Sequence, residues 1–457
     1  MKLKSGAACS SSIGAALAAV ATFAFGSPAS AQVAFASRDV AEVTYAKDVA
    51  VLLRNNCATC HRPNGIGPMD LLTYEDARRY ARRIREQVSN ELMPPYAYDR
   101  DIGIQQLEHD WRLSPEEINT IVSWVDQGAP MGDPADMPTL QPIVDTDEWR
   151  FTPEFGAPDV IVRSTPIDIP PSGLDMWHRP IVPVGVNQDR CIRAIQVKPA
   201  PGAAKAVVHH ANSTFSRLQG DGSFEATGER ASEYAMGKAG ELIPQGVCRI
   251  LPAESYVAWD IHLFPGGLGA NATDQVVEDN VVEMGIWLWP ADYQYEYKQD
   301  LALYGIRQGE LLLAPHGVAM TQGFQTFDHP VRIDSFQPHG HLRLRSASLE
   351  ILYPETGRVE VISMISNWSA VWHQSHIYAP DVAPLLPPGA VLIMKQWYDN
   401  TENNPNVLDP DLWVDGGSRT ADEMSHAWIA VTHLDEEGYQ ELLEQRRANQ
   451  ERRVTDQ

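Results

Sequence analysis

The residues with the clearest chemical potential form the run Cys57-Ala58-Thr59-Cys60-His61. Two thiols three positions apart can each add to a vinyl group of one haem, and the histidine that follows is placed to bind the iron. The run therefore predicts one covalent haem c, attached at Cys57 and Cys60 and ligated by His61. The chain has 457 residues, far more than a small cytochrome needs, so the haem is expected to serve a larger protein.

A second axial ligand is expected from a methionine well after this motif, because a thioether raises the reduction potential of the iron and suits electron transfer. Met93, which two prolines follow, is the preferred candidate. Met69 is the alternative, but it lies only eight residues beyond His61, a short reach around the haem edge. Either methionine could instead fill the core.

Later histidines have spacings that suit a metal ion. His339 and His341 are two residues apart, so on a strand they share a face and can bind one ion together. His209 and His210 are adjacent, and neighbours on a strand point to opposite faces, so they can share an ion only if the strand bends. His262 follows another apolar run. Spacing gives no role to the other histidines, which are His109, His178, His316, His329, His373, His376, His426 and His433.

Three helices are expected around the haem motif, over residues 46–55, 75–92 and 114–128. The third has clear start signals, because Ser114 can be the N-cap, Pro115 suits the first helical position and Glu117 can close a capping box. Three short helices around this motif predict a small all-α cytochrome c domain of class I over residues 32–134, followed by a linker over 135–150 that is rich in Pro, Asp and Gly.

From Trp149 onward, short strand-like runs alternate with Pro and Gly, a pattern typical of β-sandwiches. The predicted fold class is therefore multidomain, with the small all-α domain followed by two all-β domains of sandwich or jelly-roll type. We place these β domains at residues 151–305 and 306–435. A charged helix over 436–457 carries no chemistry that we can name.

The N-terminus resembles an export signal over residues 1–31, with Lys2 and Lys4 before an apolar run and an A-x-A site at Ala29–Ala31. A membrane anchor is the alternative, but the run is short for a bilayer. A periplasmic or secreted protein is expected. In an oxidising compartment Cys191 and Cys248 could pair, although sequence alone does not show that they meet.

The formal net charge of −24 argues against nucleic acid as a partner, because nucleic acid rewards basic patches. An acidic surface fits a basic electron-transfer partner, and it fits an ordinary soluble protein equally well. No later run has the length of a membrane span, so the chain is not expected to cross a membrane.

Taken in order, five motifs resemble those of the copper type II, ascorbate-dependent monooxygenases, which include peptidylglycine α-hydroxylating monooxygenase and dopamine β-monooxygenase. The resemblance covers roughly residues 150–435. The motifs are Val207-Val208-His209-His210, Asp260-Ile261-His262, Pro338-His339-Gly340-His341, Tyr398-Asp399-Asn400 with Asn404-Pro405, and Asp422-Glu423-Met424.

The resemblance implies two β-sandwiches side by side, each with one copper. It implies an electron-storing copper on His209, His210 and His262. It also implies a catalytic copper on His339, His341 and Met424, where O2 and substrate meet. The two ions would be well separated across a solvent-filled cleft. The family's animal members have several disulfides, whereas only Cys191 and Cys248 are available here.

The function expected from both patterns is a haem c and copper monooxygenase that oxygenates a small organic substrate. The haem would deliver electrons in place of ascorbate, after reduction by an external donor such as a redox protein or small reductant. The substrate does not carry over, because no residues specify a peptide carboxylate or a catecholamine. Two alternatives are a non-enzymatic copper and haem redox relay, and a haem-dependent dehydrogenase with vestigial copper sites.

Overall fold

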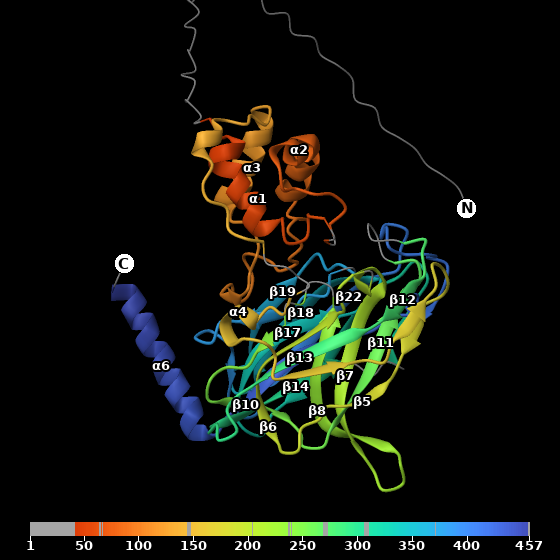
Figure 1. The fold of residues 1–457 in the computed structure, drawn as a ribbon. Helices are drawn as coiled ribbons and strands as arrows, with labels where there is room; N and C mark the ends of the chain where they lie inside the picture. The colour runs from red at the N-terminus through yellow and green to blue at the C-terminus, as the bar shows by residue number, and fades with distance from the viewer. Residues whose placement is uncertain are drawn as a thin grey trace, which may run out of the picture. The chain divides into compact units, whose positions relative to one another are not determined.

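The computed structural model describes residues 42–63, 65, 67–143, 148–202, 204–235, 238, 240–267, 273–305, 310–370 and 372–455. Figure 1 shows the chain as a ribbon. The predicted export signal lies outside the described residues. Residues 43–457 cluster as one compact unit. None of the described helices is long and apolar enough to cross a membrane.

The predicted fold class is wrong, because no separate all-α domain precedes the β part. Of the residues that the structure describes, 38% lie in strands and 17% in helices. The segment between the second and third helices leaves them and enters the β structure. There Tyr96 and Tyr98 are buried in a core made mostly of strands, and β1 (Leu107–Glu108) pairs with β20 (His376–Tyr378). Helical periodicity could not reveal this, because the aromatic rings bury against strands that follow much later in the sequence.

The helices of this region begin and end where their local chemistry dictates. A π-helical turn, Tyr45–Val49, leads into α1 (Ala50–Asn56), so Cys57 is the residue that ends the helix. Thr73 caps α2 (Tyr74–Ser89). Ser114 caps α3 (Pro115–Asp126), and the Glu117 side chain closes the predicted capping box.

The largest sheet has eleven strands and runs through the whole β part. Its central pair is β14 (Tyr297–Gly305) with β24 (His426–His433), antiparallel over eight residue pairs. On the side of β24 follow β17 (Val331–His339), β20 and β1. On the side of β14 follow β10 (Val247–Leu251), β6 (Arg190–Pro199), β13 (Val282–Leu288) and β2 (Val160–Arg163). Two short strands pair off this path: β9 (Glu241–Leu242) pairs with β6, and β21 (Leu385–Leu386) pairs with β17.

Two smaller sheets complete the β part. A five-stranded sheet contains β4 (Met176–His178), β5 (Ile181–Pro183), β7 (Val208–Leu218), β8 (Phe224–Ala235) and β11 (Tyr256–Leu263). A four-stranded sheet contains β16 (Val318–Thr326), β18 (Leu344–Tyr353), β19 (Arg358–Ile365) and β22 (Val391–Asp399). Strand pairs β3 (Ile167–Ile169) with β12 (Val277–Asn280) and β15 (Leu312–Leu313) with β23 (Val414–Asp415) stand apart.

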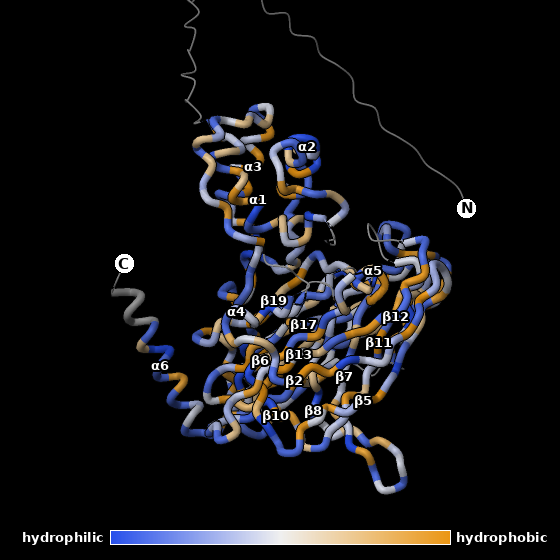
Figure 2. The backbone as a smooth tube through the Cα atoms, in the orientation of Figure 1, coloured by the Kyte–Doolittle hydropathy of each residue, from blue (hydrophilic) through white to orange (hydrophobic). Residues whose placement is uncertain are grey.

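Two large hydrophobic cores lie in the β part, and the strands of the eleven-stranded sheet contribute to both. One contains Ile195, Phe215 and Ile286, and the other contains Phe336 and Ile429. Figure 2 shows the hydrophobic residues along strands such as β13, which is buried over almost its full length. The first and second β halves therefore have separate cores but share one sheet.

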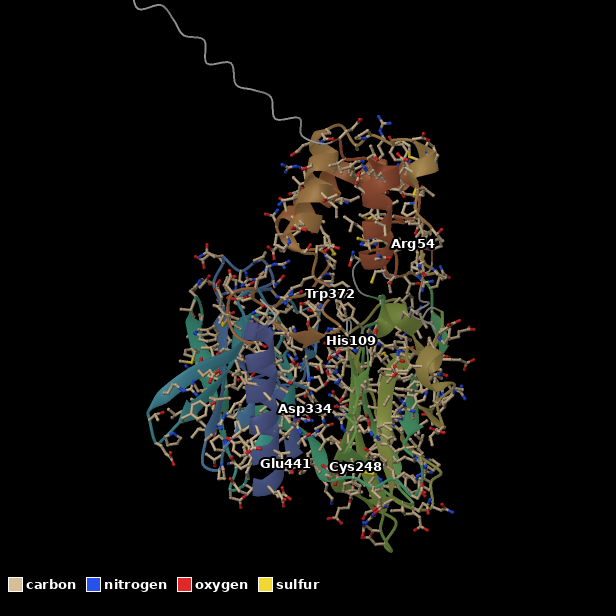
Figure 3. The ribbon with its side chains drawn as sticks, turned by 90° about the vertical axis from the view of Figure 1, so that its left-hand side faces the viewer. Arg54, His109, Cys248, Asp334, Trp372 and Glu441 are labelled. Carbon is tan, nitrogen blue, oxygen red and sulfur yellow. A yellow bond between two sulfur atoms is a disulfide. The ribbon has the colours of Figure 1, made fainter. Side chains whose placement is uncertain are left out.

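Cys191 on β6 and Cys248 on β10 form a disulfide, which confirms the pairing that the sequence left open. Figure 3 labels Cys248, and also Glu441 on α6. Helix α6 (Glu436–Thr455) fits the charged helix expected at the C-terminus. Its Tyr439 packs with Leu385 and Leu434, which holds the start of the helix against the strands.

Candidate metal centre and haem site

A β-bulge places the adjacent histidines together. On β7 and β11, His210 lies opposite His262, but the next pair is Val208 with Leu263. His209 is thus the extra residue of the bulge. A bulge locally bends a strand and redirects a side chain, which is the condition that two neighbouring histidines need to face one ion.

The rings of His209, His210 and His262, called the His triad below, converge on one point. Nδ1 of His262 lies 3.2 Å from Nδ1 of His209 and 3.2 Å from Nε2 of His210. One nitrogen from each ring lies within 4.8 Å of the others. Trp177 stacks on His262 at 4.6 Å between ring centroids. A single N–H at this point could form a hydrogen bond with only one of the other two facing nitrogens. The three nitrogens therefore have the arrangement of a metal-ligand set.

Burial keeps the triad neutral. It lowers the pKa of His209 to about 4 and that of His210 well below its ordinary value. The pKa of His262 is also lowered by burial, against the opposing effect of the Asp175 carboxylate. An Asp175 carboxylate oxygen lies 3.3 Å from Nε2 of His262. Neutral imidazole is the form that binds a metal ion.

His339 and His341 lie at the end of β17 and just beyond it. Both are buried, and their ring centroids are 5.4 Å apart. A Cβ on Gly340 would lie 2.7 Å from the Leu344 side chain, so this position needs glycine for close packing. Nδ1 of His341 lies 3.1 Å from the carbonyl oxygen of Asp422, and a hydrogen bond there leaves Nε2 free for a ligand.

Glu423 fastens the methionine segment to the HxH segment. Its buried carboxylate accepts the backbone N–H groups of His341, Arg343 and Met424. Burial raises the pKa of Glu423 to about 7. Met424 is half-buried, and its carbonyl oxygen accepts the Tyr398 hydroxyl at 2.7 Å. The structure thus brings the Met424 segment to His341.

The motif around Tyr398 has a supporting role. Besides the Tyr398 bond, the Asn400 side-chain oxygen accepts from Arg343 at 3.3 Å. The Asn404 amide donates to the carbonyl oxygen of Leu342 at 3.1 Å. These bonds hold the loop that carries His341, so the motif positions a proposed ligand without being one.

The two expected copper sites are not separated by a solvent-filled cleft. The ring centroids of His210 and His339 lie 5.6 Å apart, and both side chains are buried. Two further rings lie in the same group, since His373 is 4.8 Å from His339 and His426 stacks on His339 at 4.7 Å. Below, the histidine cluster means seven residues: His209, His210, His262, His339, His341, His373 and His426.

Sequence reasoning missed His373 and His426. His426 reaches the cluster because β24 pairs with β17, which sets it opposite His339. Its position two residues after Met424, at a strand start, was the only available signal. His373 lies on the loop between β19 and β20, and no local pattern points to it.

The haem motif has the features that a covalent haem requires. Cys57 and Cys60 are not in a disulfide. Nδ1 of His61 lies 3.0 Å from the carbonyl oxygen of Met69, so the opposite nitrogen, Nε2, is left for iron. Gly67 makes this possible, since a Cβ there would lie 2.6 Å from Nδ1 of His61. The residues present therefore fit a haem c.

The structure places the two candidate methionines in different surroundings. The Met69 carbonyl holds His61 from the side of the ring opposite to Nε2, and Met69 packs against the apolar cluster that contains Leu71. Met93 is half-buried after α2, and its role stays a prediction.

A direct contact joins the Met93 segment to the histidine cluster. The Gln374 amide donates to the carbonyl oxygen of Pro95, and its oxygen accepts the N–H of Ala97 at 3.1 Å. Gln374 directly follows His373 in the chain. A cavity of about 660 Å³ beside this contact is lined by both segments, with Leu92 from one and Trp372 (labelled in Figure 3) from the other.

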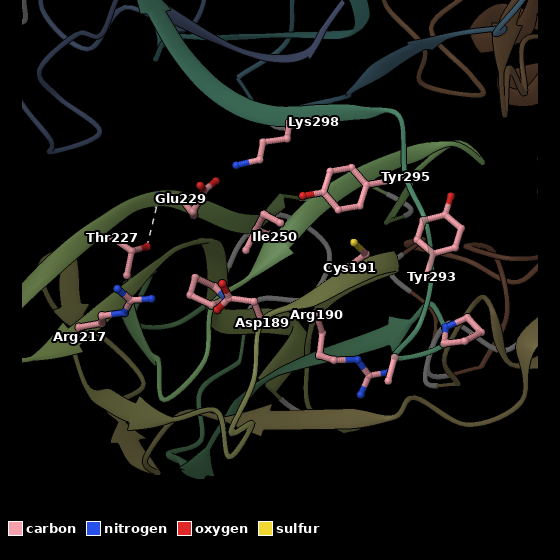
Figure 4. A pocket seen from close by; sticks show the side chains of 13 residues that line it. Asp189, Arg190, Cys191, Arg217, Thr227, Glu229, Ile250, Tyr293, Tyr295 and Lys298 are labelled. Carbon is pink, nitrogen blue, oxygen red and sulfur yellow. Dashed lines mark hydrogen bonds between the residues drawn. The ribbon is translucent and has the colours of Figure 1, made fainter.

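A second cavity, of about 370 Å³, lies among β6, β8, β10 and β14 (Figure 4). Its lining is highly charged and shares no residue with the histidine cluster. The charged lining side chains are Asp189, Arg190, Arg217, Glu229 and Lys298.

No protein-family model matches this chain, and no curated protein matches it in sequence. Among solved structures, the search finds the VP2 subviral particle of infectious bursal disease virus. The match has 10% sequence identity, covers 61% of this chain and 73% of that chain, and has a TM-score of 0.17. A similarity at that score carries no argument about fold or function.

Proposed function

We propose that the protein is an exported, copper-dependent monooxygenase that receives its electrons through a haem c. The convergence of the His triad, with its three neutral ring nitrogens, carries this proposal. The resemblance of five ordered motifs to the copper type II monooxygenases supports it. The substrate would be a small organic molecule, and an external donor would reduce the haem.

The ligand sets suit copper. Imidazole binds copper in both oxidation states, and a soft thioether favours Cu(I). His209, His210 and His262 would hold one ion, and His339, His341 and Met424 the other. Copper held there would supply one-electron chemistry with O2. The Glu423 carboxylate keeps the second set assembled, because its three backbone hydrogen bonds tie both ligand segments together.

The contact between Gln374 and the Pro95 segment supports electron delivery from the haem to the cluster. Met93, the proposed haem ligand, lies two residues before Pro95, and His373 lies one residue before Gln374. Hydrogen bonds of Gln374 thus join the segment that follows Met93 to the residue after His373, within one compact unit.

The alternative is a redox relay that does not turn over a substrate. Burial of the ligand rings favours it, because His262, His339 and His341 are each at most 5% exposed. A substrate would have to reach metal ions inside a nearly closed cluster, whereas electrons would not.

Oxygen uptake by the purified full-length protein separates the two functions. Metal and haem analysis should first give one haem and two coppers per chain. A reduced sample should then consume O2 faster when a suitable small organic substrate is added. Met424→Ala should abolish this stimulation and leave the haem absorption spectrum unchanged. Stimulation that survives in Met424→Ala would show that the oxygen site is elsewhere, and electron exchange without any stimulation would favour the relay.

A further inference from the structure

His373 lies between the two proposed copper sites. Its ring centroid is 5.7 Å from that of His209 and 6.5 Å from that of His210, both in the His triad. It is 4.8 Å from His339, in the second set. Among the proposed ligands, His210 and His339 also lie within ring contact. His373 therefore touches both sets, although its sequence context gives it no role.

The inclination to the His339 ring distinguishes His373 from His426. In the His triad, ring centroids lie 5.0 to 5.3 Å apart and the planes are inclined by 51° to 71°. His373 and His339 repeat this arrangement at 4.8 Å and 81°. His426 instead lies nearly parallel to His339, at 20°, and His373 is in turn nearly parallel to His210, at 24°.

The chemistry of His373 suits an additional ligand. Its Nε2 lies 3.1 Å from the carbonyl oxygen of Ala370, so Nε2–H donates there and Nδ1 keeps its lone pair. The side chain is only 3% exposed, and its other ring neighbour is Trp368 at 5.2 Å.

We propose that the two copper sites lie close enough to form one magnetically coupled dicopper centre and that His373 supplies a further ligand to one of its ions through Nδ1. This inference rests on the proposed function, since it assumes that both sites bind copper. It changes the chemistry expected of the centre, because two coupled ions can deliver two electrons to O2 without long-range transfer between separate sites.

Electron paramagnetic resonance of the copper-loaded, fully oxidised protein tests the inference. Two isolated Cu(II) ions give the full spin intensity expected from chemical copper analysis. A coupled pair gives a lower intensity and a half-field transition. We expect the coupled result in the natural protein, and full intensity without a half-field transition would overturn the inference. Because this measurement needs no variant, it remains decisive even if a substitution prevents folding.

The His373→Asn variant tests the role of the residue itself. We expect the spin intensity to rise toward that of isolated ions, or the second copper to be lost. A spectrum and copper content identical to those of the natural protein would refute the role of His373. His376→Asn is the matched control, since His376 is also buried but its ring contacts Tyr96 and Tyr98. If the control changes the spectrum equally, the effect is general packing and the assignment fails.

The results also separate this inference from the proposed function. If the protein binds two coppers whose spins are isolated, the coupled centre is wrong and the monooxygenase proposal stands. If the protein binds no copper, the proposed function is wrong as well.

Discussion

Backbone carbonyl groups occupy one ring nitrogen in three of the proposed ligands. Met69 does so for His61, Asp422 for His341 and Ala370 for His373. In each case the bond fixes the tautomer and the ring orientation, and it leaves the other nitrogen for a metal. Fixing the ring orientation in this way needs little additional conformational entropy, because the carbonyl groups belong to neighbouring loops that the fold already orders.

Gly67 provides a test at the haem site. A methyl group at this position would meet Nδ1 of His61 at 2.6 Å, so Gly67→Ala should displace the ring from the Met69 carbonyl. We expect overpacking of this kind to destabilise the haem-bound protein by about 1–3 kcal/mol. The haem spectrum should show a weakened His61 ligand. Absorption spectroscopy and thermal unfolding of the haem-loaded protein measure both effects.

Gly220→Ala is the matched control for this substitution. An added Cβ there has nothing within 4 Å, and its backbone is not in the left-handed region. The control should leave spectrum and stability unchanged. An unchanged Gly67→Ala protein would contradict the close packing of His61 that the structure shows.

Local spacing predicted some of the proposed ligands but not the cluster. His339 and His341 follow from a period of two, while His209 and His210 required a bend that the sequence did not reveal. His373 and His426 could not be predicted, because loop placement and the pairing of β17 with β24 bring them in. The separation between the two sites was predicted wrongly, since it came from the resemblance alone.

At the scale of elements, two loops connect the haem region to the cluster. The segment after α2 and the loop before β20 are joined near His373 by Gln374, and a few residues away by Asp99, which accepts the N–H and hydroxyl of Ser366. Of these two contacts, only the one made by Gln374 involves a residue that directly follows a cluster histidine, His373. The two contacts therefore allow one route to be weakened while the other is kept.

The Gln374→Ala variant should slow electron transfer from haem to copper. Removing the amide deletes the bonds to Pro95 and Ala97, and so loosens the shortest polar connection to His373. We expect reoxidation of reduced haem by the oxygenated, copper-loaded protein to slow several-fold in a stopped-flow trace. Ser366→Ala removes a bond between the same loops and should have a much smaller effect. Haem that is not reoxidised even in the natural protein would refute electron delivery by this route.

The helices and strands were predictable to different extents. The N-cap of α3 at Ser114 followed from its capping box, because this signal lies within four residues. The burial of Tyr96 and Tyr98 against strands did not, because their neighbours Ser363 and Tyr378 come more than 260 residues later. The all-α domain expected over residues 32–134 was wrong for this reason.

At the scale of the molecule, the buried histidines make the copper-free protein sensitive to acid. Unfolded histidine has a pKa near 6.5, whereas burial lowers the pKa of His341 to about 4 and lowers those of His210, His339 and His373 well below the ordinary value. Between these values the unfolded chain binds more protons than the folded one. The contribution of these neutral, buried histidines to the free energy of unfolding is therefore fully present above pH 6.5 and is lost as the pH falls toward 4.

Each such histidine should remove up to about 1.4 kcal/mol of unfolding free energy per pH unit within this window. Two buried carboxyls, Glu233 and Glu423, have a pKa raised to about 7 and act in the opposite direction, but the histidines outnumber them. Denaturant unfolding at pH 7, 6 and 5 measures the slope. Copper should shift the loss to lower pH, because it competes with protons for the rings. Equal stability of the copper-free protein at pH 7 and pH 5 would contradict the buried cluster.

The position of β24 has a consequence for how the protein is made. It is the last strand in the sequence, yet it lies in the middle of the largest sheet, between β17 and β14. Without it, β14 keeps only its short parallel pairing with β10, and β17 loses the neighbour that sets His426 opposite His339. Such non-local pairing forms late and slowly. The edges of β14 and β17 that β24 covers therefore stay unpaired until nearly the whole chain has been synthesised, and a metal ion bound at the histidine cluster would enter only after that.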